Sequence, residues 1–386
     1  MSTPARRPSA LWLWSGPEAS NALRTRDLAV ILRTYRRLTK ISQDQLSGVL
    51  GYDKTYISMI ENRRRIITDV GTLRHIAHTL AIPVHVVGVT EADDATFVAM
   101  LQFADSVLTL ADTARQSGRA IEAVNELWPL VARLEARAAE GLIERDSLAV
   151  LGRARLSLGL ALGNVLPDDK LSTAAKWTGR ALIVAEHLGD RDFLAHVVTM
   201  HGNELRKAGR VGAAIQRTQH GLALAHDAEA RTSACAVLAR AAGEAGRADL
   251  FDAAIDGYRR HLDEAGGTGM LANPFTFREI ILRGLVATGR ATQAARLLDQ
   301  RPNIAVAPQW TIIEQITVGD VLLANGDRSE AETTLLCALT EAEAYRLPHQ
   351  VQRAIDTANS RNVDVVTKAG QAMLTRLRLS TGFRIK

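Results

Sequence analysis

The chain has 386 residues, of which 47% are hydrophobic, 4% aromatic and 23% charged, with a formal net charge of +5 at pH 7. This length allows two or three domains with sizeable cores, and the scarcity of aromatic residues argues against β-sandwiches and favours packed helices. No apolar run approaches the length of a membrane span, and the stretch Leu11–Trp14 is too short for a secretory signal. We therefore expect an all-α protein located in the cytoplasm.

The positive charge is concentrated near the N-terminus. Residues 1–90 contain 13 Lys and Arg against 6 Asp and Glu, a net charge of +7, which leaves 34 against 36, a net charge of −2, for residues 91–386. A basic module of this kind is typical of proteins that bind nucleic acid through its phosphates. The two cysteines, Cys235 and Cys337, lie in helical patterns, which favours free thiols over a disulfide or a metal site.

Residues 1–22 contain three prolines and the tryptophan pair Trp12 and Trp14. The prolines favour an N-terminal arm that precedes the first domain. A free arm would expose both tryptophans, so the alternative is that they dock on the folded body. The sequence leaves both possibilities open.

The first strong helix is predicted over residues 27–39. Its apolar side chains recur at the spacing of one helix face, at Leu28, Ile31, Leu32, Tyr35 and Leu38. A fourth helix is predicted over Asp69–Leu80, and Pro83 opens a short fifth one. The polar stretch at Glu91–Thr96 is a natural boundary, so we expect one domain over residues 23–90 and another over residues 97–386.

Residues 42–65 predict two short helices joined by a tight turn. Ser42 followed by Gln45 matches a capping box, which marks the start of a helix. Gly51 stands where that helix should end, because glycine adopts the left-handed conformation at little cost. Asp53 can cap the next helix, whose polar N-terminal half and basic tail suit the major groove of DNA.

These segments, in this order, resemble the phage-repressor (Xre-type) helix-turn-helix family. The resemblance runs from about Leu28 to Val89 and includes Leu32–Arg37, Ser42–Leu46, Tyr56–Glu61, Leu73–Ala77 and Leu80–Pro83. It implies a five-helix, lambda-repressor-like domain that binds double-stranded DNA. It also implies that Arg36 pairs with Glu61 and clamps the first helix to the third. The alternative is that Arg36 contacts a phosphate.

The resemblance also assigns contacts with DNA. Phosphate contacts fall to five polar or basic side chains: Gln43, Asn62, Arg63, Arg64 and Arg65. Contacts with bases, or with the adjoining backbone, fall to four side chains of the third helix: Lys54, Thr55, Tyr56 and Ser58. Lys54 is suited to guanine, although Lys54 and Thr55 are also interpretable as solvated residues at a helix cap. Two copies in a dimer would read inverted half-sites about one helical turn apart.

From about Phe97 onward, a sequence pattern recurs in which one helix, a glycine turn and a second helix follow one another. The turns fall at Gly118, Gly209, Gly246, Gly289 and Gly326, of which the last four are 37, 43 and 37 residues apart. A degenerate unit is expected around Leu158 to Trp177. This period predicts five to seven helical hairpins stacked as an α-solenoid with a concave face.

The hairpins resemble tetratricopeptide repeats, and the two domains together resemble the architecture of RRNPP-type quorum-sensing regulators. In that family an Xre-type domain precedes a repeat domain that binds a peptide and forms the dimer. The resemblance implies a homodimer with an effector, which is equally a peptide, a small molecule or a protein. Effector contacts are assigned to Asn203, Arg206, Arg240 and Arg283, with hydrogen bonding between repeats as the alternative.

The sequence contains no catalytic constellation, metal site or cofactor motif that we recognise. Gly266–Gly269, for example, lacks the Gly-Lys-Ser/Thr that completes a phosphate-binding loop. We therefore expect a non-enzymatic transcription regulator that binds an inverted-repeat operator as a dimer. The alternative is an interaction scaffold in which the repeats bind partners and the helix-turn-helix is an accessory tether.

Overall fold

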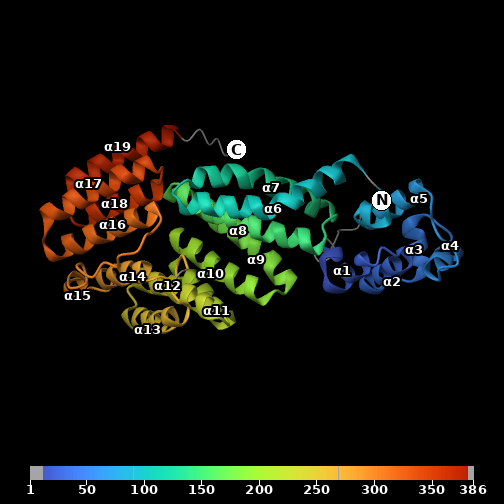
Figure 1. Cartoon of the computed structure of the whole chain (residues 1–386), viewed down its shortest axis with the longest axis horizontal. Helices are drawn as coiled ribbons and strands as arrows, with labels where there is room; N and C mark the ends of the chain where they lie inside the picture. Colours follow the sequence, from blue (N-terminus) through green and yellow to red (C-terminus); the bar gives the residue numbers. More distant parts are fainter. Residues whose placement is uncertain (1–11, 90, 268, 381–386) are drawn as a thin grey trace. The chain divides into compact units, whose positions relative to one another are not determined.

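The computed structural model describes residues 12–89, 91–267 and 269–380. Every regular element in these residues is a helix, which confirms the all-α fold class (Figure 1). The chain divides into two compact units, Met1–Leu108 with Trp128–Ala154, and Thr109–Leu127 with Arg155–Lys386. We call these the first and the second unit. Three helices contribute residues to both units: α6 (Ala92–Gln116), α7 (Ala120–Glu140) and α8 (Arg145–Val165).

The first unit contains a small helical domain with one continuous core. Its elements are η2 (Leu13–Ser15), α1 (Pro17–Arg24), α2 (Leu28–Thr39), α3 (Gln43–Leu50), α4 (Lys54–Glu61), α5 (Val70–Leu80) and η3 (Val84–Val87). Ile31, Leu46, Ile57 and Ile76 come from four of these helices and are fully buried together. Helices α2 to α5 therefore lie where the sequence predicts four of the five helices.

The fifth predicted helix is a single 3-10 turn. Pro83 precedes η3, and Gly88 ends it in the left-handed conformation with φ of 81°. The four residues between these two leave room for one turn only. Val84 and Val86 are nevertheless buried in the domain core, so the turn keeps the packing role expected of the helix.

The segment expected to form an N-terminal arm belongs, from Leu13 onward, to the domain core. Trp14 is only 1% exposed, and its indole Nε1 donates a hydrogen bond to the carbonyl of Leu80 at 2.9 Å. Its ring also stacks on Tyr35. The expected domain start at residue 23 is therefore too late, because a buried tryptophan with a long-range partner has no local sequence signature. Residues 1–11 of the expected arm lie outside the described residues.

The ends of the short helices are defined by local capping interactions. Ser42 and Gln45 form the expected capping box at the start of α3, and Gly51 ends that helix with φ of 70°. Asp53 caps α4 by accepting a hydrogen bond from a backbone N–H of its first turn. Asp27 and Asp69 cap α2 and α5 in the same way. These caps satisfy backbone donors that an eight-residue helix otherwise leaves open.

One buried carboxylate connects three helices of this domain. Arg36 on α2 donates from Nε and Nη2 to the two carboxylate oxygens of Glu61 on α4, at 2.6 and 2.8 Å. Gln43 on α3 donates to the same carboxylate at 2.7 Å. Burial alone would raise the pKa of Glu61, but the hydrogen bonds from Arg36 and Gln43 and the charge of Arg36 hold it below its usual value. A lowered pKa means that this interaction stabilises the fold at neutral pH and is lost on acidification.

The remaining helices form consecutive packed pairs, consistent with the expected α-solenoid (Figure 1). After α6, α7 and α8 they are η4 (Asp168–Lys170), α9 (Leu171–Leu188), α10 (Arg191–Lys207), α11 (Val211–Leu224), α12 (Ala228–Glu244), α13 (Ala248–Glu264), α14 (Pro274–Ala287), α15 (Ala291–Ala295), α16 (Pro308–Asn325), α17 (Arg328–Ala344), α18 (Pro348–Ser360) and α19 (Asp364–Ser380). The second helix of one pair, α15, has only five residues, so the pairs are less regular than the spacing suggests.

The recurring glycines sit at the turns inside these pairs. All five have positive φ, with values of 81°, 74°, 66°, 78° and 94° for Gly118, Gly209, Gly246, Gly289 and Gly326. Residues with a Cβ rarely adopt this conformation, which explains why glycine recurs there. The pair α8 and α9 lacks such a glycine and is joined instead through Pro167 and η4, the degenerate unit that the sequence predicts.

Two glycines allow α12 and α14 to pack closely. A Cβ added at Gly243 would lie 3.2 Å from the Cα of Gly284. A Cβ added at Gly284 would overlap the ring of Phe251, which is itself fully buried. The aromatic ring therefore fills the space that a side chain at Gly284 would need.

Two helical segments are long and apolar enough to cross a membrane by length and composition alone: Ala95–Gln116 and Arg145–Val165. The sequence-based expectation that no apolar run approaches this length was therefore too strict. The apolar window of the second segment is 78% buried within the protein, and interior helices pass the same test.

Replacing Arg36 by Met should destabilise the first unit by roughly 3 kcal/mol at pH 7, because the buried Glu61 carboxylate loses its charge partner. Hydrogen exchange of peptides from α2 and α4, measured on the full chain, reports this loss locally. The loss should shrink as the pH falls towards 4.5, the ordinary pKa of Glu61, because burial without Arg36 raises the pKa of the unpaired carboxyl and it takes up a proton.

Arg37→Met is the matched control, because Arg37 lies next to Arg36 but pairs with Glu18 on the protein surface. Surface ion pairs contribute about 0–1 kcal/mol, so its exchange rates should stay close to those of the wild type. Equal effects of the two substitutions would contradict the role assigned to the buried pair.

Replacing Gly284 by Ala should destabilise the second unit by about 1–3 kcal/mol, the usual cost of overpacking a core. Gly212→Ala on α11 is the control, because its added Cβ would meet nothing within 4 Å and should be neutral or slightly stabilising. Chemical denaturation of both variants tests this. A wild-type denaturation midpoint for Gly284→Ala would show that Phe251 moves aside freely.

Candidate functional site

The first turn of α4 is the best candidate for contact with DNA bases. Ile57 and Ile60 are buried in the domain core and fix the helix, whereas Lys54 and Thr55 are exposed. The side chain of Asp53 accepts a hydrogen bond from the Thr55 N–H at 2.7 Å and orders this turn. The helix therefore presents an ordered, solvent-facing N-terminal end, as a recognition helix must in the major groove.

Gln43 is positioned by the buried ion pair of the same domain. It is the first residue of α3, and its side-chain amide donates to Glu61. Backbone N–H groups at the start of a helix have no partner inside the helix and suit a phosphate group. The ion pair thus holds the start of α3 next to α4, where both could meet one DNA strand.

Tyr56 is half-buried against other side chains. Its ring centroid lies 5.0 Å from that of Tyr52, and the guanidinium carbon of Arg65 lies 4.5 Å from the Tyr56 ring centroid. Tyr52 in turn meets His75 edge-on. This cluster fixes the orientation of Tyr56 and Arg65 on one side of α4. The packing of Tyr52 and His75 beside it was not foreseen, because they come from elements on either side of α4 in the chain.

The residues that follow α4 are not equivalent. Asn62 donates to the hydroxyl of Ser58 at 3.3 Å, so these two predicted DNA contacts are coupled. Arg63, with φ of 54°, donates from Nε and Nη2 to one carboxylate oxygen of Asp27, at 3.0 and 2.7 Å. The structure gives Arg64 no ion pair with any described residue, and its side chain is exposed. Arg64 is therefore freer than Arg63 to meet a phosphate.

Asp27 is a residue whose second role the sequence did not indicate. It caps α2 through Ala29 and also holds Arg63, which lies 36 positions further along the chain. Burial alone would raise its pKa, but the hydrogen bond from Arg63 and those from the backbone hold the pKa of Asp27 below its usual value. No pattern in the sequence links two residues that the fold brings together across α2 and α4.

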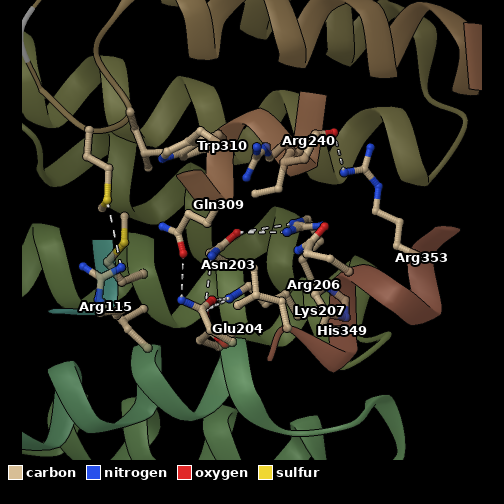
Figure 2. Close-up of a pocket in the computed structure, with 18 of the residues that line it drawn as sticks. Arg115, Asn203, Glu204, Arg206, Lys207, Arg240, Gln309, Trp310, His349 and Arg353 are labelled. Atoms are coloured by element: carbon tan, nitrogen blue, oxygen red, sulfur yellow. Dashed lines mark hydrogen bonds and ion pairs between the residues drawn. The ribbon is translucent and has the colours of Figure 1, made fainter. Parts of the chain in front are cut away.

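All four residues assigned to effector binding line one cavity of the second unit, with a volume of about 90 Å³. Figure 2 labels three of them, Asn203, Arg206 and Arg240. Asn203 and Arg206 come from α10, Arg240 from α12 and Arg283 from α14. The sequence placed each of them on the first helix of its pair. It gave no sign that all four converge on a single enclosed space.

Three of these side chains, the arginines, also bond between helical pairs, which is the alternative that the sequence left open. Arg206 and Arg283 both donate to Oε1 of Glu244, at 2.5 and 2.6 Å. Arg240 donates to Glu279 at 2.9 Å, and Glu279 is fully buried. The two roles therefore coincide, because buried carboxylates anchor guanidinium groups that also line the cavity.

Further polar side chains line this cavity that sequence reasoning did not identify. They are Arg115, Glu204, Lys207, Trp310, His349 and Arg353 (Figure 2). They come from α6, α10, α16 and α18, so the cavity collects residues separated by more than half of the chain. No local motif marks such a set.

Comparison with known families identifies the domain that contains the first of these two candidate sites. Residues 32–86 match the family model described as helix-turn-helix, a family of DNA-binding regulators and not of enzymes. The matched segment runs from α2 to η3 and includes the Arg36–Glu61 pair and the whole of α4. No curated protein matches the chain. Residues 32–86 are thus an Xre-type helix-turn-helix domain.

Proposed function

We propose that this protein is a sequence-specific transcription regulator that binds an inverted-repeat operator as a homodimer. The observation that carries the proposal is the ordered, exposed first turn of α4, within a domain that matches a DNA-binding family. The net charge of +7 on residues 1–90 supports it, since phosphates attract such a module. The site of action would be the chromosomal DNA in the cytoplasm of a bacterium.

Recognition of the operator falls to α4 in this proposal. Lys54 and Thr55 face base edges, Ser58 and Tyr56 lie further along the same helix, and Gln43 contacts a phosphate at the start of α3. The basic residues after α4 add affinity that does not depend on sequence. The Arg36–Glu61 pair acts indirectly, because it fixes the angle between the helices that carry these contacts.

The effector would bind in the tetratricopeptide-like second unit, at the cavity lined by Asn203, Arg206, Arg240 and Arg283. The several buried charges around this cavity support the proposal, since burying a charge is costly unless a partner compensates it. Helix α8 contributes residues to both units: Arg145 donates to the carbonyl of Ser15 in the first unit, and Asn164 lines the cavity in the second. We infer that an effector alters DNA binding through this shared helix.

The double variant Lys54→Ala/Thr55→Ala should lose about 1–3 kcal/mol of discrimination for each base contact that it removes. The operator would first be identified by immunoprecipitation of the tagged protein with sequencing of the bound DNA, and affinity then measured by mobility shift. Lys176→Ala, an exposed lysine of α9 in the second unit, should leave operator binding unchanged. Normal operator binding by a correctly folded double variant would refute the role of α4.

Arg64→Ala should weaken binding to all DNA sequences and lower the slope of log affinity against log salt concentration by about 0.9, the value for one lost phosphate contact. Arg63→Ala should change the slope less, because Asp27 already engages that guanidinium in the free protein. Titrations of one operator at several salt concentrations measure both slopes. A larger change for Arg63→Ala would mean that Arg63 leaves Asp27 when DNA binds.

A further inference from the structure

The cavity of the second unit is strongly basic, although residues 91–386 carry a net charge of −2. Six of its lining side chains are cations: Arg115, Arg206, Lys207, Arg240, Arg283 and Arg353. Arg206 and Arg240 are each at least nine-tenths buried. Positive charge is therefore concentrated among largely buried side chains, where a bound anion would interact more strongly than at the exposed surface.

The carboxylates around the cavity are too few to balance these cations. Glu244 is shared by Arg206 and Arg283, and Glu279 is shared by Arg240 and Arg353. The other two cations have one carboxylate each: Glu204 lies 2.9 Å from Lys207, and Asp112 lies 3.3 Å from Arg115. Six cations thus face four paired carboxylates, an excess of two positive charges.

Two further titratable groups face the same cations. His349 lines the cavity and pairs with Asp168 at 2.9 Å. Asp320 makes no ion pair with any described residue, and burial raises its pKa despite the nearby charges of Arg353, Arg361 and Arg283. Asp320 is therefore a fifth negative charge close to the cluster, and the six cations still exceed the carboxylates by one.

The cations in the cavity destabilise one another. Burial, together with the charges of Arg283 and Arg240, lowers the pKa of Arg353 to about 9 against the opposing effects of Glu279 and Asp320. Burial also lowers the pKa of Arg206 and of Lys207, and in each case neighbouring cations contribute. A bound anion would relieve this repulsion and raise the pKa of these cations.

Unpaired polar atoms around the cavity indicate which polar groups the ligand contains. The Nε of Arg240 is a buried donor without a hydrogen-bond partner among the described residues, and Glu204 Oε2 and Gln350 Oε1 are buried acceptors in the same situation. Buried polar groups are usually paired, so these three atoms fit a ligand better than they fit an empty site. The donor suits an oxyanion, and the two acceptors suit hydroxyl groups.

The size of the cavity limits the ligand. A volume of about 90 Å³ is well below the 300–1,000 Å³ that is typical for drug-sized ligands, so the cavity suits a small ligand. Part of the wall is apolar, because Leu160, Leu271 and Ile313 also line the cavity. The enclosed part therefore fits a compact molecule with a short carbon skeleton.

We propose that this cavity binds a small hydroxylated polyanion, a phosphorylated polyol or a hydroxy-polycarboxylate, through its excess cations. The oxyanion groups face Arg240, Arg283 and Arg115, and the hydroxyl groups face Glu204 and Gln350. The proposed binding site depends only on the geometry of the second unit. Only its regulatory consequence, that the anion changes operator binding, rests on the proposed function.

The test is calorimetric titration of the full chain with glycerol 3-phosphate, citrate and inorganic phosphate at constant ionic strength, with uncharged glycerol as the control ligand. Saturable binding of at least one anion and none of glycerol is expected. The phosphate and carboxylate probes separate the two sources of oxyanion. No saturable binding of any of the three anions would overturn the proposal.

Arg283→Met and Arg115→Met are the informative variants, since neither leaves a buried carboxylate without a cation: Glu244 keeps Arg206, and Asp112 is partly exposed. Loss of one charge-assisted hydrogen bond should weaken anion binding roughly 10-fold or more. Arg259→Met, which removes an exposed arginine that pairs with Asp256, should bind the anion as the wild type does. Unchanged binding in both cavity variants, with wild-type thermal unfolding, would place the anion elsewhere and refute the site.

A mobility shift of the operator, with and without the anion, separates this inference from the proposed function. A change in operator affinity that Arg283→Met abolishes supports both. Anion binding without any effect on operator affinity supports the ligand class and overturns its regulatory role. Anion binding by a protein that shifts no DNA supports the cavity site and overturns the proposed function.

Discussion

Burying a carboxylate between helices requires several donors, and this constraint recurs throughout the protein. In the first unit, Glu61 accepts hydrogen bonds from Arg36 and Gln43. In the second unit, Glu244, Glu279 and Glu314 each meet two arginines. Loss of all its donors would leave a buried charge without compensation, so each group fixes the segments that supply its donors.

The balance between carboxylates and their cationic partners differs between the two units, and so does its structural consequence. Around Glu61 the charges are matched, and the result is a rigid arrangement of α2, α3 and α4 that leaves the first turn of α4 free for DNA. Around Glu244 and Glu279 the cations exceed the carboxylates, and the result is a cavity with unsatisfied positive charge. The same interaction thus serves as a clamp where it is balanced and as a receptor for anions where it is not.

Local features of the fold could be predicted from the sequence because they depend on neighbouring residues. The capping box of Ser42 and Gln45 and the left-handed turn at Gly51 involve atoms a few positions apart. The five hairpin glycines are of the same kind, since positive φ is a property of a single residue. The fifth helix was predicted less well, because Pro83 and Gly88 leave space for one 3-10 turn only.

The sequence by itself determined the all-α class, the helix-turn-helix and the periodic glycine turns, since composition, spacing and helix caps depend on residues close together in the chain. The tertiary structure decided where Trp14 docks, that Arg63 is held by Asp27, and that cations from five helices surround one cavity. These outcomes depend on side chains far apart in the chain, and a segment with a net negative charge gives no indication that its cations converge. Distance along the chain is the physical reason, because only packing brings such groups within reach of a common partner.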